Sequence, residues 1–369
     1  MSDVRADAAP AIRRTPTVPP LGPYGATLPP LELVDEPEAF CVDEVPAYAP
    51  SGEGTHAWLR VRKRLRNTRE VVDALAAAAS VHPREVGVAG QKDQNAVTTQ
   101  WFSVGGLPRG GPPPSAWRLP PGVEIVEATW HTNKLRVGQV AANRFRLVFE
   151  TPEAESAAPQ VRAALDALGP SMPNYFGRQR FGRGGANLEA ALRWASRCEP
   201  LRGHNARFRE TLYASVLQSE VFNLYTAWRL DDKRPLLAGE VVRLRGSRSV
   251  FVVEDPDAEL HRLHSGDISL TGPMFGPKTR QAAGEPAAHE ARCVATLGLS
   301  VDAMAFLARR AEGARRDLCV AVDGTGVEVD GPSRIVVTFT LPSGSYATQV
   351  VRELTRLPWD APFRADLNE

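Results

Sequence analysis

The sequence predicts a mixed α/β protein in which one domain, divided in the sequence, is interrupted by a mainly helical insertion. Strand-like alternation near both ends of the chain, at 56–65 and 334–341, predicts the divided domain. The helical pattern from about 173 to 318 predicts the insertion. A chain of 369 residues can form one large or two medium domains with a sizeable core. The sequence alone leaves open whether the two ends meet in one sheet.

Composition narrows the class of protein. Hydrophobic residues make up 43% and charged residues 24% of the chain, as in ordinary globular proteins. No apolar run approaches the roughly 18 residues that a membrane helix needs, and the N-terminus has no basic-then-apolar signal pattern. We therefore expect a cytoplasmic protein that contacts no membrane. The net charge of +1 argues against a uniformly basic protein, although local basic patches remain compatible with it.

The cysteines and histidines predict neither a metal site nor a disulfide framework. The four cysteines are far apart and form no Cys-x-x-Cys pair, and the seven histidines show no metal-ligand spacing. We therefore expect no metal. The cysteines are Cys41, Cys198, Cys293 and Cys319.

The N-terminal part begins with a tail and continues as strand and helix. Residues 1–30 are rich in Pro and Ala and are predicted to be a mobile tail, with order beginning near 40–44. A strand follows at 56–65, and Asn67 with Glu70 predicts a helix cap. On this strand Ala57, Leu59 and Val61 share one face, and Arg60, Arg62 and Arg64 share the other.

The next two predicted strands, 86–89 and 97–104, surround a turn that carries an acidic side chain. Gly90 allows the backbone a tight or left-handed path. Asp93 is therefore offered from a loop that two strands hold in place, which suits a reactive group. The alternative is an Asp that only bonds its own backbone, as Asp in turns usually does.

The remaining elements follow in order. An alternating strand at 143–150 contains Phe145, and an aromatic residue on such a strand is most often part of a core. The other predicted elements are a helix at 153–168, a helix from 187, a long helix near 206–230, a hairpin at 241–253, two helices near 286–311, a strand at 334–341 and a helix at 346–357.

Basic residues cluster at three places, 60–69, 133–138 and 174–185. Guanidinium groups bind phosphates, aromatic faces take bases, and glycines let a main chain approach closely. For 60–69 the pattern favours a solvated basic face. For 174–185, where Arg and aromatic residues alternate with Gly, it favours RNA contact over a basic surface above core aromatics. The candidate RNA-binding residues are Lys134, Arg136, Arg178, Arg180 and Arg183.

Four separate motifs, in order, resemble the TruD family of tRNA pseudouridine synthases. They are Gly90-Gln91-Lys92-Asp93 with Ala96-Val97-Thr98-Thr99-Gln100, Asn143-Arg144-Phe145, Pro173-Asn174-Tyr175-Phe176-Gly177 with Gln179-Arg180-Phe181-Gly182, and Leu341-Pro342-Ser343-Gly344-Ser345-Tyr346 with Val351-Arg352-Glu353-Leu354. The resemblance covers about 40 to 356.

The resemblance implies a fold and a domain organisation. The catalytic domain would comprise 31–172 and 319–369 around a mixed, largely antiparallel sheet. The segment 173–318 would be the family's inserted domain, which with the catalytic domain makes an RNA-binding cleft. The family modifies the uridine at tRNA position 13 without cofactor or metal. The oligomeric state stays open, with a monomer as the expectation.

The resemblance also implies roles for single residues. Asp93 matches the catalytic aspartate, and Lys92 is its neighbour. Phe145 matches the aromatic residue that stacks on the target uracil, and Asn143 a polar residue that places the loop or the base. Arg352 joins the candidate RNA-binding residues.

The chemistry of pseudouridine formation explains these residue types. Breaking the N1–C1′ glycosidic bond builds positive charge at the sugar, which a carboxylate can stabilise or attack. Whether Asp93 attacks the sugar or takes a proton from it stays open. The uracil must leave the RNA stack at a cost of a few kcal/mol, and aromatic stacking returns roughly 1–3 kcal/mol per base.

One position departs from the family pattern. The family has a Lys before the Phe40 segment, poised to pair with the catalytic Asp, and by counting its place is taken here by Val34. Another cation near the cleft, such as Lys92 or Arg352, would then serve, or activity would be weakened. This departure is the only support for one rival function, a non-catalytic tRNA-binding or tRNA-folding chaperone on this scaffold. A second rival, a hydrolase of nucleoside glycosidic bonds, would need a second carboxylate or a metal near Asp93, which no motif supplies.

Overall fold

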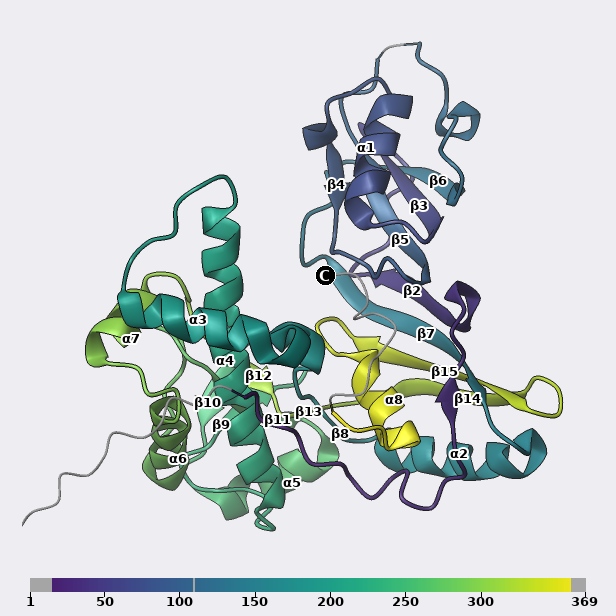
Figure 1. Ribbon diagram of the computed structural model, residues 1–369. Helices are drawn as coiled ribbons and strands as arrows, with labels where there is room; N and C mark the ends of the chain where they lie inside the picture. Colours follow the sequence, from purple (N-terminus) through teal and green to yellow (C-terminus); the bar gives the residue numbers. More distant parts are fainter. Residues whose placement is uncertain (1–14, 109, 360–369) are drawn as a thin grey trace, which may run out of the picture. The chain divides into compact units, whose positions relative to one another are not determined.

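A computed structural model describes residues 15–108 and 110–359 (Figure 1). The chain divides into two compact units. The first, which we call the sheet unit, comprises 22–172 and 321–357. The second, which we call the insert unit, comprises 173–320 together with the described residues before Gly22 and after Leu357. The insertion thus divides the sheet unit in the sequence.

A nine-stranded sheet forms the centre of the sheet unit, with the main strand order β14-β15-β7-β2-β5-β3-β6. β2 and β5 pair in parallel, and the other pairings are antiparallel. β1 pairs with β7, and β4 pairs with β5. The strands are β1 Glu32–Leu33, β2 Phe40–Pro46, β3 His56–Arg64, β4 Val86–Val88, β5 Val97–Val104, β6 Val123–His131, β7 Val140–Glu150, β14 Asp323–Val329 and β15 Arg334–Pro342.

The two ends of the chain do meet in this sheet. β15 pairs with β7 over their whole common length, and Phe339 lies opposite Phe145. The sheet is therefore mixed and largely antiparallel, as the family resemblance implied.

The α-helices among the described residues of the sheet unit are α1 Thr68–Ala78, α2 Ala154–Leu168 and α8 Ala347–Thr355. α1 begins as predicted, because the Asn67 side chain accepts a hydrogen bond from the backbone N–H of Glu70. Its buried residues Val71 and Leu75 join a core cluster with Leu59 and Val61 of β3. α2 lies against β14 and β15 (Figure 1).

The two faces of the sheet differ in character because side chains alternate along each strand. We call the face that α1 covers the inner face. One row of register partners on it is Lys63, Thr98, Val42, Phe145 and Phe339. We call the opposite face the outer face. The adjacent row on it is Arg62, Thr99, Asp43, Arg144 and Thr340.

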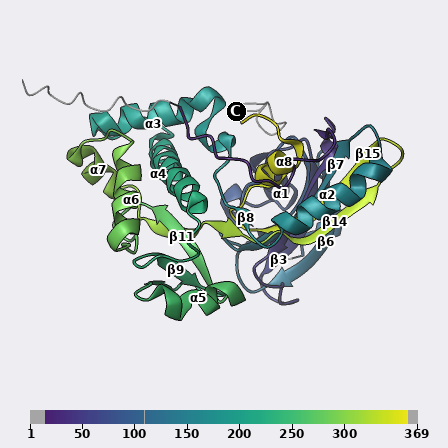
Figure 2. The same ribbon diagram turned by 90° about the horizontal axis from the view of Figure 1, so that it is seen from below.

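The insert unit combines helices with a small sheet of order β10-β9-β11-β12. α4 packs against α3 and β11 (Figure 2). The α-helices among the described residues of the insert unit are α3 Ala186–Arg197, α4 Ala206–Asp231, α5 Pro256–Ser265, α6 Gly284–Ala295 and α7 Val301–Ala308. Its sheet strands are β9 Val241–Leu244, β10 Val250–Val252, β11 Ile268–Met274 and β12 Ala314–Asp317, and β8 Met172–Pro173 pairs with β13 Cys319–Val320.

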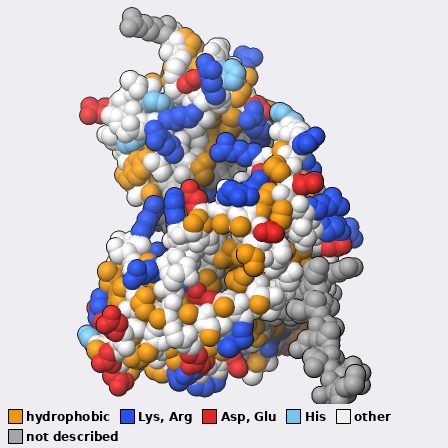
Figure 3. Space-filling model, turned by 90° about the vertical axis from the view of Figure 1, so that its left-hand side faces the viewer, with side chains coloured by type: hydrophobic (Ala, Val, Ile, Leu, Met, Phe, Trp, Pro, Cys, Tyr) orange, Lys and Arg blue, Asp and Glu red, His pale blue; other side chains and the backbone are white. Residues whose placement is uncertain are grey.

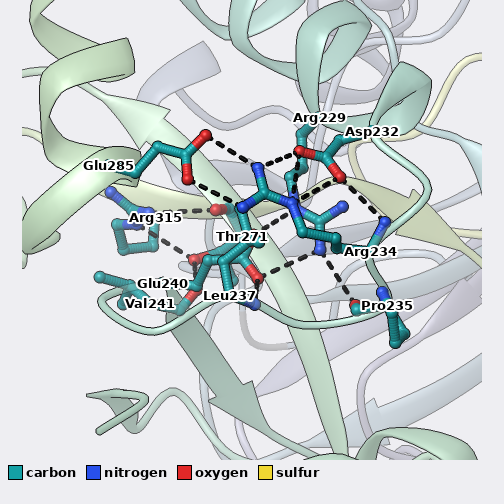
Figure 4. Close-up of polar contacts among 10 residues, drawn as sticks. All are labelled: Arg229, Asp232, Arg234, Pro235, Leu237, Glu240, Val241, Thr271, Glu285 and Arg315. Atoms are coloured by element: carbon teal, nitrogen blue, oxygen red, sulfur yellow. Dashed lines mark hydrogen bonds and ion pairs between the residues drawn. The ribbon is translucent and has the colours of Figure 1, made fainter.

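Paired charges lie inside the insert unit (Figure 4). The side chains of Arg229 and Glu240 form an ion pair and are each 3% exposed. Arg229 also donates to the Pro235 carbonyl, and Glu240 accepts the Leu237 N–H at 2.7 Å. Because these donors and acceptors are satisfied, the buried charges are tolerated.

The predicted mobile tail of residues 1–30 is only partly covered by the structure, since 1–14 lie outside the described residues. From residue 15 the chain has fixed partners, which differs from the expectation. The Thr17 backbone N–H and hydroxyl donate to the Glu220 carboxylate, the hydroxyl at 2.6 Å. The Gly22 N–H donates to the Glu353 carboxylate at 3.0 Å. Buried carboxylates that need donors thus hold a Pro-rich segment that forms no regular structure of its own.

Within the described residues, no helix is long and apolar enough to cross a membrane.

Candidate active site

Asp93 lies on the loop 89–96, which joins β4 to β5. Ala89 and Ala96, at the two ends of this loop, are buried, whereas Asp93 itself is exposed. β4 and β5 pair antiparallel, so both ends of the loop are anchored in the sheet. The carboxylate is therefore presented to the outside from a fixed base.

Two buried side chains hold the first half of this loop. The Thr68 hydroxyl accepts a hydrogen bond from the Lys92 N–H at 3.0 Å and donates to Gln100 Oε1 at 3.1 Å. Gln100 Nε2 in turn donates to the Gly90 carbonyl at 3.2 Å. α1 and β5 are thus tied to the main chain on the N-terminal side of Asp93.

Lys63 holds the loop at Asp93 itself. Its side chain is fully buried, and its ammonium group donates to the main-chain oxygens of Asp93 at 2.6 Å, of Arg66 at 2.7 Å and of Lys92 at 3.3 Å. Burial lowers the pKa of Lys63 to about 8, and the negative charge of Asp93 opposes this shift. Each of the three ammonium protons has a carbonyl acceptor, so only the charged form of Lys63 can make all three hydrogen bonds.

Sequence reasoning missed Lys63, although a signal was available. Position 63 continues the apolar series of Ala57, Leu59 and Val61, and not the basic series of the opposite face. A lysine in an apolar series is a candidate for a buried, hydrogen-bonded charge.

Lys92 points its charge at Glu44. The two form an ion pair with Nζ and Oε2 2.8 Å apart, and their side chains are 9% and 0% exposed. Glu44 Oε1 also accepts the Trp101 N–H at 3.1 Å. Lys92 thus stands next to Asp93 in the sequence, but a buried carboxylate balances its charge.

Phe145 lies on the inner face, the same face as Lys63. It is 8% exposed and contacts two other rings: Phe339 is stacked on it at 5.2 Å, and Phe40 meets it edge-on at 6.3 Å. Three strand spacings separate Phe145 from Lys63, roughly 14 Å across the sheet. Phe145 is therefore a member of the core and is only slightly exposed.

Asn143 lies two residues before Phe145 on the same face and opposite Glu44. Its side-chain oxygen is buried and has no hydrogen-bond partner among residues 15–108 and 110–359. A buried amide oxygen without a donor is costly, and it marks Asn143 as an acceptor open to a bound group.

The candidate RNA-binding residues lie in both units. In the sheet unit, Arg136 is exposed, the Lys134 ammonium donates to the Arg84 carbonyl, and Arg352 is half-buried on α8. In the insert unit, Arg183 is exposed and Arg178 is half-buried. Arg180, also half-buried, lies 5.5 Å from the centre of the Phe176 ring.

The aromatic residues around these arginines correct one part of the sequence interpretation. Tyr175, Phe176 and Phe181 are 2%, 6% and 1% exposed, so they belong to the core of the insert unit and offer no open face to a base. Gly182, Gly184 and Gly185 have φ of 71°, 63° and 83°, values that side chains disfavour. The glycines shape this loop, and the arginines carry its charge.

One face of the molecule shows groups of basic side chains (Figure 3). On the face drawn in Figure 3, Lys and Arg form several groups with hydrophobic side chains between them. The small net charge therefore conceals local basic patches.

Val34, at the position expected for the family Lys, is buried in an apolar cluster with Ala39, Val148 and Val336. Its backbone N–H donates to the Val148 carbonyl at 3.0 Å. The cation beside the Asp93 main chain is instead Lys63, from β3. Among the described residues, no group of three or more His, Cys, Asp or Glu could hold a metal ion.

The mixed sheet with its aspartate loop, together with the four motifs in both units, is that of a pseudouridine synthase, a class of RNA-modifying isomerases. The sequence model of the family "tRNA pseudouridine synthase D (TruD)" matches residues 31–188 and 207–354, and the chain belongs to this family.

Relatives agree with this assignment. The chain is 42% identical over 335 residues to the tRNA pseudouridine synthase D of Anaeromyxobacter dehalogenans, covering 89% of this chain and 94% of the relative. It is 38% identical over 338 residues to that of Thermus thermophilus, covering 88% and 89%. The crystal structure of a putative tRNA pseudouridine synthase D from Methanosarcina mazei has the same fold, with a TM-score of 0.66 at 22% identity over 90% of this chain and 95% of that one.

Proposed function

We propose that this protein converts a uridine of tRNA, at position 13 by family resemblance, to pseudouridine, with Asp93 as its catalytic residue. One observation carries the proposal: Asp93 is exposed, while the main chain on which it stands is bound by buried side chains of α1, β3 and β5. A rigid base under an exposed carboxylate is what positioned catalysis requires.

The reaction is an isomerisation and needs no co-reactant. The C1′–N1 bond breaks and a C1′–C5 bond forms, while C5 loses its proton and N1 gains one. An ionised Asp93 serves either as a nucleophile toward C1′ or as a base toward the sugar. Exclusion of water is essential in both cases, because water would trap the sugar and release uracil.

Asn143 and Phe145 are proposed to hold the flipped uracil. The open oxygen of Asn143 accepts the N3–H of the base, which removes the cost of leaving that oxygen without a partner. The uracil is proposed to stack on Phe145, whose side chain is held by its stacking contact with Phe339.

The charge at the loop is proposed to come from Lys63, with Lys92 as a support. Lys63 donates to the Asp93 main chain, so it fixes the direction of the carboxylate. The ion pair with Glu44 ties Lys92 to β2. Lys134, Arg136, Arg178, Arg180, Arg183 and Arg352 are proposed to contact RNA phosphates.

The sheet unit is accordingly proposed as the catalytic domain and the insert unit as an RNA-binding domain. The test is to incubate the purified protein with an unmodified tRNA transcript and to map pseudouridine by carbodiimide-blocked reverse transcription. A stop at position 13 that disappears with Asp93→Asn is the expected result. Retained tRNA binding without any stop contradicts the proposal.

Val34 supports a second candidate, a tRNA-binding or tRNA-folding chaperone, because an apolar residue stands where the family has its lysine. Failure of the mapping experiment, combined with faster refolding of a misfolded transcript, would favour it. Release of free uracil would point instead to a nucleoside hydrolase.

A further inference from the structure

The outer face of the sheet carries a groove that the proposed reaction does not use. Its volume is about 630 Å³, within the range of ligand sites. Its floor is made of the register row Thr340, Arg144, Asp43, Thr99 and Arg62. A second row, Thr338, Arg146, Cys41 and Val97, lies beside it.

The groove lies on the opposite face of the sheet from the strand residues of the candidate active site, Lys63, Asn143 and Phe145. Lys63, whose ammonium binds the Asp93 main chain, points to the inner face, whereas its neighbour Arg62 lines the groove. Phe145 separates Arg144 and Arg146 on β7 and is directed away from them. The two sites therefore share strands but not side-chain directions.

Positive charge dominates the groove. Its lining includes four arginines and one carboxylate, that of Asp43. Arg60 is paired with Asp43 at 2.6 Å and lies 3.9 Å from Glu127. Arg62 and Arg144 are exposed and form no ion pair within residues 15–108 and 110–359. In the register row, Arg62 and Arg144 stand at either side of the pair Thr99 and Asp43. The Asp43 carboxylate is already paired with Arg60.

The chemistry of the lining selects phosphate. Guanidinium forks and threonine hydroxyls donate to phosphate oxygens, and two arginines two residues apart on β7 repeat at roughly 6.6 Å along the strand. Phe145 and Phe339 are also lining residues, but their side chains belong to the inner-face row and are 8% and 1% exposed, so neither offers the groove an open ring face for a base. The groove therefore fits a phosphate backbone better than a nucleoside.

We propose that the outer-face groove is a second RNA-binding site, which holds the phosphodiester backbone of the RNA through Arg62 and Arg144. That the bound polyanion is RNA rests on the proposed function; the anion site itself does not. The site reads no base, so it contributes affinity and orientation without sequence preference.

The test compares Arg62→Ala/Arg144→Ala with Arg69→Ala/Arg84→Ala. The control pair removes the same charge from exposed residues of α1 and of the segment before β4, outside the groove. The probe is a short labelled oligoadenylate, which has no uridine and undergoes no reaction. Binding is measured at several salt concentrations, and thermal melting checks that each variant is folded.

We expect the groove variant to bind the oligoadenylate about tenfold more weakly than the wild type, with a salt slope lower by about 0.7 for each phosphate that it no longer neutralises. The control variant should match the wild type. Equal slopes and affinities in both variants would overturn the proposal. Binding of ATP to the same variants is measured as well. If the groove variant lost ATP binding but kept oligoadenylate binding, the proposal would also be overturned, because the groove would then serve a free nucleotide.

Steady-state kinetics with unmodified tRNA distinguish this proposal from the proposed function. With unmodified tRNA the groove variant should raise KM and leave kcat unchanged, since neither Asp93 nor Lys63 lines the groove. If the wild type forms no pseudouridine but the oligoadenylate result holds, the proposed reaction fails and the anion site stands.

Discussion

The buried ammonium group of Lys63 lies 2.6 Å from the main-chain oxygen of Asp93, so the candidate catalytic loop rests on a charge supplied by a neighbouring strand. Lys63 binds three carbonyl oxygens at once, and each bond uses one ammonium proton. The geometry of Asp93 therefore depends on the protonation of a residue that need not touch the RNA.

Activity is expected to decline as the pH rises through about 8, where Lys63 loses a proton and one of its three acceptors loses its donor. Single-turnover rates across the pH range measure this. In Lys63→Met the rate should be low throughout and the step near pH 8 should be absent. An unchanged step in that variant would assign it to another group.

Unfolding cannot explain that decline, because the linkage has the opposite sign. The pKa of Lys63 is lowered in the folded state, so between about 8 and the ordinary value of 10.5 the unfolded chain binds more protons. The contribution of Lys63 to the free energy of unfolding therefore rises with pH in this window. Denaturant titrations at the two ends of the window, on wild type and Lys63→Met, measure that contribution.

Asp93→Asn should lower the rate of pseudouridine formation at least about 10²-fold, the lower end of what a positioned acid or base contributes. The tRNA affinity should change little, because Asp93 is exposed and its loop is held through the main chain. Asp73→Asn, at an exposed aspartate on α1 paired with Arg69, is the matched control and should behave as wild type. Comparable rates in the two variants would contradict the catalytic assignment.

Variants of Phe145 and Phe339 can distinguish a substrate contact from a core contact. The two rings stack on each other and are both buried, but only Phe145 is proposed to contact the base. Phe145→Leu and Phe339→Leu should lower the melting temperature by similar amounts. Only Phe145→Leu should lower kcat well beyond what the loss of stability explains. Parallel losses of activity in both variants would make Phe145 a core residue alone.

Thr68→Val replaces the hydroxyl by a methyl group of similar size and leaves both the Lys92 N–H and Gln100 Oε1 without their partner. We expect a loss of about 1–3 kcal/mol in the free energy of unfolding, together with a lower kcat at unchanged tRNA affinity. Thr68→Ser retains the hydroxyl and should restore kcat. A serine variant no better than valine would refute the role of this hydrogen bond.

Arg229→Met leaves the Glu240 carboxylate buried without its cation, and we expect a loss of about 3–5 kcal/mol in stability. The control is Arg234→Met. Arg234 binds Asp232 and Glu285 nearby (Figure 4), but its side chain is 52% exposed, so its removal should cost at most about 1 kcal/mol. Denaturant unfolding of the two variants measures the difference, and equal losses would contradict it.

Local signals in the sequence predicted much of the fold. The Asn67 cap, the turn between β4 and β5, and the long helix α4 each depend on neighbouring residues, and the structure confirms all three. β6 and β14 were missed because they are largely exposed and their apolar alternation is broken. The pairing of β15 with β7 joins distant segments, which no local pattern specifies.

For the candidate site, the sequence indicated which residues to consider but not their surroundings. It could not show that Glu44 balances Lys92, that Lys63 supports Asp93, or that Val34 lies in an apolar cluster. Each of these depends on strands that become neighbours only in the folded sheet. Position 63 alone carried a readable signal, through its place in an apolar series.

The pairing of β15 with β7 also sets an order of events during synthesis of the chain. Phe145 leaves the ribosome early, but Phe339, which covers one face of its ring, emerges only after the whole insertion has been made. Until then β7 presents an unpaired edge, which is open to wrong partners. A nascent or truncated chain that ends before residue 334 would therefore carry Asp93 and its loop, but Phe145 would lack the contact with Phe339. Such a chain would be open to capture by chaperones or proteases.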